Sequence, residues 1–432
     1  MGIKDKAKTL RTKFKLDSHH AIERFGVLFG VIATSFVVIF GATGISAYAN
    51  TEASLSSKAL YTPTFLTSKT NISGNVPGVF VNKDRTRAMV LMQFNDTSQV
   101  SVNADDYQGF LTGSTRDLNK QGLKTTVAGS VYVFGSTGYM AVMLDSDKPF
   151  SPQIMDLTMR ANSELVYKKD DGSTTNRKDL AATDTSFQKY DQWRVFFNPG
   201  GSEAKVSAAL DGDKVDVGAV FNEVVVSTEE QKIRTTMDAQ LALMQTDLNR
   251  IKDGTDELER TTADSGTLHL MPPAVPKQIA GDAVDGKAAV GNTASTLDLK
   301  TKFTMPLGYD FDWRSGSVKE GYLKGLIPKG SNYVSYLAGR AKETPDEFRI
   351  NDMKWLLNDG TDLKKDYDSG NATVKPLFDI MNKLSQAYQD YYKDKKVYQV
   401  DQHKKLLDLE VSLRNVESNF TMKDGEDVLL SY

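Results

Sequence analysis

The spacing of apolar residues divides the chain into a β-rich first half and a largely helical remainder. Residues 127–134 and 139–144 are rich in β-branched and aromatic side chains and flank the glycine-containing turn 135–138, which predicts a tight hairpin. Similar short runs, separated by Gly, Asn and Asp, recur from residue 60 to residue 226. Roughly seven or more short strands in that range predict a β-sandwich-like domain.

At Ser227 the apolar spacing changes to that of a long helix. Ser227 and Glu230 have the spacing of a capping box, which is typical of a helix N-terminus. In the helix that we predict over residues 227–262, apolar side chains recur at alternating intervals of about four and three residues, the seam of a coiled coil. This seam consists of Met237, Leu241, Met244, Leu248 and Ile251.

A second long amphipathic helix is predicted in the C-terminal segment, residues 371–432. Two polar residues, Lys395 and Gln402, interrupt its apolar stripe, so we expect a break or a loose centre near residues 393–403. The two helices can pair antiparallel within one chain as a stalk, or they can form a coiled coil between chains, and the spacing is compatible with both. The interaction positions expected on this helix are Leu377, Leu384, Tyr388 and Tyr391.

Two segments with weaker patterns lie between the long helices. Residues 263–296 are rich in Gly, Ala and Pro and show no periodicity, which predicts a flexible linker or an extended loop. Residues 297–370 mix short alternating and apolar runs. We therefore predict a small mixed α/β segment there.

The N-terminal residues predict where the chain is located. Residues 25–48 are uncharged and mostly apolar, and a helix of that length is about 36 Å long, enough to cross a hydrocarbon core of roughly 30 Å. Because Lys and Arg outnumber Asp and Glu in residues 1–24, the positive-inside rule places this basic leader in the cytoplasm and the bulk of the chain outside the cell membrane. We predict a signal anchor over residues 25–49. The motif Ala47-Tyr48-Ala49 also fits cleavage of a signal peptide, and this alternative stays open.

Together these patterns predict an α+β protein with an N-terminal transmembrane helix, an extracytoplasmic β-sandwich-like domain, long antiparallel coiled-coil helices and a small mixed α/β segment.

The composition of the chain excludes some classes of partner and of active site. The 432 residues carry 53 Lys and Arg against 56 Asp and Glu, a net charge of −3, so we expect no nucleic-acid partner. The absence of cysteine excludes thiol nucleophiles and thiolate metal sites.

Few residues in the sequence suggest catalysis. None of the four histidines belongs to a zinc-binding motif, and we place His403 on a polar helix face; phosphate-binding loops and nucleophile-elbow motifs are absent. We expect no enzymatic activity, cofactor or metal. Asp310, Asp312 and Glu320 are the carboxylates considered as a pair for glycan hydrolysis, since aromatic residues surround them. The interpretation that we favour is a surface strand edge with inward-packed aromatics and solvated charges.

Two stretches of sequence resemble a known group of proteins. They are residues 129–139, GSVYVFGSTGY, and residues 306–316, PLGYDFDWRSG. Both are similar to segments of membrane-anchored proteins that Gram-positive conjugative plasmids and integrative elements encode together with type IV secretion machinery. The resemblance implies a structural or adaptor subunit outside the cytoplasmic membrane, and it transfers no functional residue to this chain.

These observations lead to two main hypotheses of function. The first is a single-pass envelope protein that acts as a structural or adaptor subunit of a Gram-positive conjugation machinery, with protein partners, a second copy of the chain among them. The second is a cell-wall-binding or glycan-active protein centred on residues 306–322. A third, a surface receptor or adhesin, is disfavoured because nothing in the composition would span a thick wall.

Overall fold

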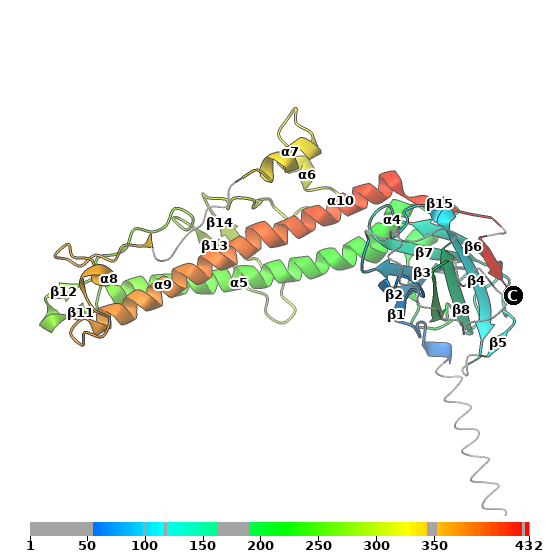
Figure 1. The fold of residues 1–432 in the computed structure, drawn as a ribbon, viewed down its shortest axis with the longest axis horizontal. Coiled ribbons are helices and arrows are strands. Elements are labelled where there is room, and N and C mark those ends of the chain that lie inside the picture. Colours follow the sequence, from blue (N-terminus) through cyan, green and yellow to red (C-terminus); the bar gives the residue numbers. More distant parts are fainter. Residues whose placement is uncertain are drawn as a thin grey trace, which may run out of the picture.

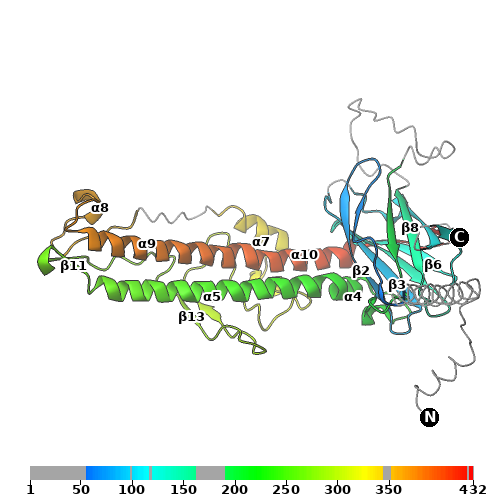
Figure 2. The ribbon, with the colours of Figure 1, turned by 90° about the horizontal axis from the view of Figure 1, so that it is seen from below.

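The computed structural model describes residues 55–97, 100–115, 119–161, 190–343, 352–425 and 428–431. Over these residues the chain forms a two-sheet β domain from which a long helical stalk projects (Figure 1). Figure 2 shows the same arrangement from a second direction, with the stalk helices side by side.

The predicted fold class is corrected at the transmembrane helix. Within the described ranges, no helix combines the length and the apolar character needed to cross a membrane. The predicted leader, residues 1–24, and the predicted anchor, residues 25–49, lie outside the described residues. Over the described residues the α+β architecture consists of the β domain and the stalk.

The β domain is built from two mainly antiparallel sheets. The larger has the order β1-β2-β3-β7-β6-β15, with β10 added to β2, and the smaller has the order β16-β4-β8-β9, with β5 added to β4. The strands of the larger sheet are β1 (Thr64–Leu66), β2 (Ser73–Val81), β3 (Arg87–Phe94), β6 (Ala128–Val133), β7 (Tyr139–Asp145), β10 (Lys205–Val206) and β15 (Thr421–Lys423). Those of the smaller are β4 (Tyr107–Ser114), β5 (Lys120–Gln121), β8 (Ile154–Ala161), β9 (Gln192–Phe197) and β16 (Leu429–Ser431).

Alternate side chains of the larger sheet enter two different cores, because successive residues of a strand point to opposite faces. Val79 and Val90 pack in the core between the two sheets. Phe80 and Met89, one position along, pack in the core shared with the helices. The larger sheet is therefore the middle layer, between the smaller sheet and the base of the stalk.

Each side of the stalk is one continuous helical rod. The outgoing rod consists of α4 (Val217–Phe221), a π-helical turn η3 (Asn222–Val226) and α5 (Ser227–Leu258), and the returning rod of α9 (Lys375–Lys396), a π-helical turn η6 (Val397–Gln402) and α10 (His403–Asn419). At 1.5 Å per residue α5 alone is about 48 Å long. The expected break near residues 393–403 is a π-helical turn in an unbroken rod.

The segment between the rods is folded against them. It contains the short strands β11 (Thr262–Ala263), β12 (Leu268–His269), β13 (Ala283–Asp285) and β14 (Asp298–Lys300) and the helices α6 (Leu323–Leu326), α7 (Tyr333–Arg340) and α8 (Leu363–Asp366). This segment also contains the 3₁₀ turn η4 (Asp264–Gly266), whereas the 3₁₀ turns η1 (Ala104–Asp106) and η2 (Ala208–Leu210) precede the stalk. Leu270, Ile279 and Val284 are buried in the stalk core. Of the two alternatives predicted for residues 263–296, the structure therefore shows an extended segment packed on the rods and not a flexible linker.

Both ends of the stalk join the same β domain. Phe221 at the start of the outgoing rod packs 5.4 Å from Phe134 and 5.6 Å from Tyr139, measured between ring centroids. Near the end of the returning rod, Asn415 donates to Ser136 Oγ at 3.0 Å in the β6–β7 turn. Gly135 of that turn has φ +55°, and a Cβ there would lie 2.1 Å from Asn415 Oδ1, so only glycine allows this approach.

Candidate functional site

The residues that the sequence singled out for interaction form the interior of the stalk. Met237, Leu241 and Met244 of α5 are fully buried, and Leu248 and Ile251 are half-buried against the same core. The four interaction positions predicted on α9 are also buried: Leu377, Leu384, Tyr388 and Tyr391. Their neighbours belong to the same chain, so this seam is an intramolecular core and not a free surface for another chain.

The carboxylates considered for glycan hydrolysis lie on a loop that crosses the stalk. Asp310, Asp312 and Glu320 are exposed. Asp312 accepts hydrogen bonds from Ser315 Oγ at 2.5 Å and from the backbone N–H groups of Arg314 and Ser315 at 3.0 and 3.1 Å. The Ser315 hydroxyl and backbone N–H lower the pKa of Asp312. Asp312 therefore closes a local turn and is not poised to move a proton.

The aromatic residues of this loop face the helices. Trp313 is 4 % exposed, and its Nε1 donates to Tyr398 Oη at 2.9 Å. The guanidinium groups of Arg314 and Arg234 lie 4.3 and 5.7 Å from the centroid of the Trp313 ring. Such a buried ring cannot act as a sugar-stacking platform. The inward packing of Trp313 agrees with the interpretation that we favoured, but the predicted strand edge is wrong, since residues 306–322 form a loop with turns.

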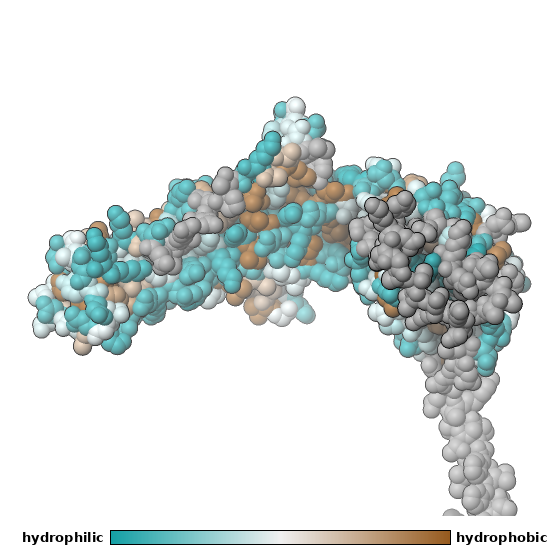
Figure 3. All heavy atoms as spheres, viewed as in Figure 1, coloured by the Kyte–Doolittle hydropathy of each residue, from teal (hydrophilic) through white to brown (hydrophobic). Residues whose placement is uncertain are grey.

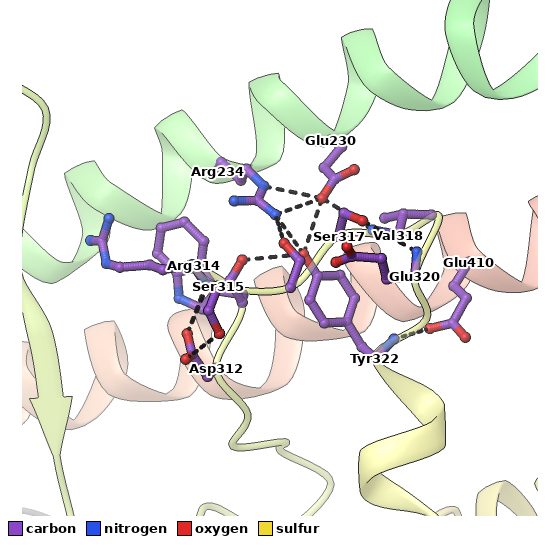
Figure 4. Close-up of polar contacts among 12 residues, drawn as sticks. Glu230, Arg234, Asp312, Arg314, Ser315, Ser317, Val318, Glu320, Tyr322 and Glu410 are labelled. Atoms are coloured by element: carbon purple, nitrogen blue, oxygen red, sulfur yellow. Dashed lines mark hydrogen bonds and ion pairs between the residues drawn. The ribbon is translucent and has the colours of Figure 1, made fainter.

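A polar network fastens the loop to α5. Figure 4 shows Arg234 and Glu230 pointing from α5 toward the loop and toward Tyr322. Arg234 donates to Tyr322 Oη at 2.7 Å and to the Gly316 carbonyl at 2.5 Å, and it pairs with Glu230 at 2.8 Å. Burial, together with the neighbouring Glu230, raises the pKa of Tyr322, so the phenol stays protonated and donates to Glu230 Oε1 at 3.0 Å.

The returning rod holds the other end of the loop. Glu410 of α10 is 3 % exposed, and its Oε2 accepts the backbone N–H groups of Tyr322 at 2.7 Å and Leu323 at 3.0 Å (Figure 4). These N–H groups belong to the N-cap residue and to the first residue of α6, and N–H groups at a helix start have no partner inside the helix. Burial raises the pKa of Glu410. The loop thus ties both rods together, and we read it as a structural brace.

The sequence suggested that His403 lies on a polar helix face. In the structure it lies instead beside this brace. It is fully buried at the junction of η6 and α10, with the rings of Phe311 and Tyr398 edge-on at 4.7 and 4.6 Å. Nδ1 lies 2.9 Å from the Tyr398 carbonyl, which only accepts, so Nδ1 carries a proton. Burial lowers the pKa of His403 to about 4. The imidazole is therefore neutral at pH 7 and serves packing.

A hollow lies toward the end of the stalk that is remote from the β domain. A cavity of about 540 Å³ opens between two segments, residues 271–276 and 352–356, which are joined by the Leu270–Leu357 bridge. Two apolar side chains of its lining are exposed, Met271 at 47 % and Leu356 at 40 %, and Val275, between the lining residues Ala274 and Pro276 in sequence, is 50 % exposed. We call these three residues the tip patch. No local pattern in the sequence marks this patch, because two separated segments form it.

The outer surface of the stalk is otherwise largely polar. Figure 3 shows hydrophilic residues along most of the visible face, with hydrophobic ones gathered beside α6 and α7. In the part of the chain that the structure describes, no group of three or more His, Asp or Glu side chains is arranged to hold a metal ion. Comparisons with protein-family models, with curated proteins and with solved structures found no match for this chain.

Proposed function

We propose that the chain is a structural or adaptor subunit that works through protein–protein contacts at a Gram-positive cell envelope, within a type IV secretion machinery. One observation carries the proposal: a braced stalk holds the exposed tip patch far from the β domain (Figure 1). Exposed apolar groups that cluster around a hollow are typical of interaction sites. The location at the envelope depends on residues 1–49 and stays a prediction from sequence.

The shape fits a spacer or connector. The inner faces of the rods are filled by the chain itself, so the stalk needs no second chain to bury its apolar stripe. Met271 is unbranched and can adapt its conformation to a partner, a property that favours binding surfaces. The glycan-active alternative gains no support, because Asp310, Asp312 and Glu320 are absent from the lining of the tip cavity.

The proposal is tested by cross-linking the full-length protein in its native membrane, purifying it and identifying the bound proteins by mass spectrometry. We expect secretion-channel subunits with the wild type and their loss with the double variant Met271→Asp/Leu356→Asp. Val290→Asp is the matched control, since Val290 is 75 % exposed and is not part of the tip patch. Equal recovery from all three proteins, or recovery of wall polymer alone, would contradict the proposal.

A further inference from the structure

A lysine and an aspartate are buried together between α9 and the segment that leads into β13. Lys395 Nζ lies 2.7 Å from Asp282 Oδ2, and both side chains are 0 % exposed. Nζ also lies 2.7 Å from the Gln278 carbonyl and 2.8 Å from Thr301 Oγ1. Fixed neighbours therefore hold the amine in contact with the carboxyl group.

Two hydroxyl groups complete the arrangement around the carboxyl group. Thr301 Oγ1 accepts from Lys395 and lies 2.6 Å from Asp282 Oδ1, closer than its second acceptor, the Phe303 carbonyl at 3.1 Å. Tyr391 Oη donates to Oδ2 at 2.8 Å. Thr301 thus links the amine to one carboxyl oxygen, and Tyr391 binds the other.

The site disfavours separated charges. Taking an ammonium and a carboxylate out of water costs more than their attraction returns unless the geometry is very good. Burial lowers the pKa of Lys395 in spite of Asp282, which favours the neutral amine. A neutral amine is nucleophilic, and a neutral acid can lose water.

We propose that Lys395 and Asp282 condense to an intramolecular amide bond that links α9 to the segment before β13. No cofactor or oxidant is required, since the ammonium and the carboxylate contain all the atoms of the amide and one water molecule. The chain has no cysteine, so this link would be its covalent brace.

The contacts of Thr301 and Tyr391 provide a path for each proton of the reaction. Thr301 relays one proton from Nζ to Oδ1, leaving an amine and an acid. Nζ then attacks Cγ, the C–N bond forms, and the Tyr391 hydroxyl stabilises the negative charge on Oδ2. A second proton passes from Nζ through Thr301 to Oδ1, which leaves as water while Oδ2 returns to a carbonyl. The product keeps one N–H and no charge.

The test is the mass of the full-length protein, followed by peptide mapping. We expect a mass lower than that of the sequence by one water molecule, and a branched peptide that joins Lys395 to Asp282. In Asp282→Asn the same amide should form with loss of ammonia instead of water. Lys395→Arg is the matched control, because a guanidinium stays protonated and does not attack. Thr301→Val should slow the reaction in freshly folded protein.

Wild-type protein with the unreduced mass and no branched peptide, after prolonged incubation at neutral pH, overturns the proposal. This result does not depend on whether any variant folds. A branched peptide that persists in Lys395→Arg would also overturn it, because the link would then involve another lysine. The outcome is independent of the proposed function, which concerns the tip patch.

Discussion

At the scale of single residues, buried polar groups inside the stalk control its response to pH. Asp247 on α5 is 6 % exposed. Its Oδ1 accepts from Arg250 at 3.0 Å, and its Oδ2 receives no hydrogen bond from the described residues. Burial, with a further contribution from Asp394, raises the pKa of Asp247 to about 6. In the unfolded chain an aspartate has a pKa of about 3.9, so folding favours the protonated form.

A pH-dependent stability follows from this shift. A raised folded-state pKa gives stability that is present below about pH 4 and is lost as the pH rises through about 6. Asp247→Asn stays neutral at every pH. The variant should therefore exceed the wild type in free energy of unfolding by about 1 kcal/mol near neutral pH and match it near pH 4, in urea titrations followed by circular dichroism. Asp253→Asn, at an exposed position of the same helix, is the control. An unchanged pH dependence in Asp247→Asn would contradict the assignment.

At the scale of the elements, burial of the inner face of α5 makes the main contribution to the pairing of the two rods. Leu241 is 0 % exposed, whereas Leu243 on the same helix is 53 % exposed. Leu241→Ala should lower the free energy of unfolding by about 2–4 kcal/mol, because it leaves a cavity between the rods. Leu243→Ala should change it by less than about 0.5 kcal/mol. Both are measured by urea unfolding, and equal losses would show that the rods do not pack as described.

Local patterns in the sequence predict the long helices. Contacts between residues that are far apart in the sequence cannot be predicted in this way. The helix expected over residues 227–262 appears as Ser227–Leu258, since apolar spacing is a property of neighbouring residues. The predicted capping box is wrong: Ser227 lies inside a continuous rod, and its hydroxyl donates to the Asn222 carbonyl of the preceding turn. Lys395 interrupts the expected stripe and is nevertheless buried, because it pairs with Asp282. Asp282 lies 113 residues away along the chain, so a local pattern cannot reveal the pair. Leu270 and Ile279 are isolated apolar residues in a segment without periodicity, so no sequence pattern predicts that they are buried in the stalk core.

At the scale of the whole molecule, the stalk is an excursion from the β domain and not an appendage at its end. β15 pairs antiparallel with β6, and β16 pairs parallel with β4, so each sheet gains a strand from beyond the stalk. The predicted division into a β domain at residues 60–226 and a separate C-terminal tail missed these two strands. Each has three residues, too few for an alternating pattern to be read.

Closure of the β domain should depend on one side chain. Leu429 is 7 % exposed and packs where a Cβ on Gly109 or Gly129 would come within 2.7 or 2.3 Å of it. Leu429→Ala should therefore lower the free energy of unfolding of the β domain by about 2–3 kcal/mol, measured by the fluorescence of buried Trp193. Met422→Ala on β15 is the control, since Met422 is 47 % exposed. A loss no larger than that of the control would mean that β16 does not close the smaller sheet.

The return of the chain to its starting domain also sets the order in which the molecule can be completed. Until β15 and β16 have been synthesised, the edges of β6 and β4 that they cover have unpaired N–H and C=O groups. Such open edges recruit other strands and promote aggregation. The rods, by contrast, bury their apolar faces with contacts that need no sheet. A ribosome or an export channel would thus release a finished stalk on an unfinished domain, and the last strands to arrive would protect the first ones made.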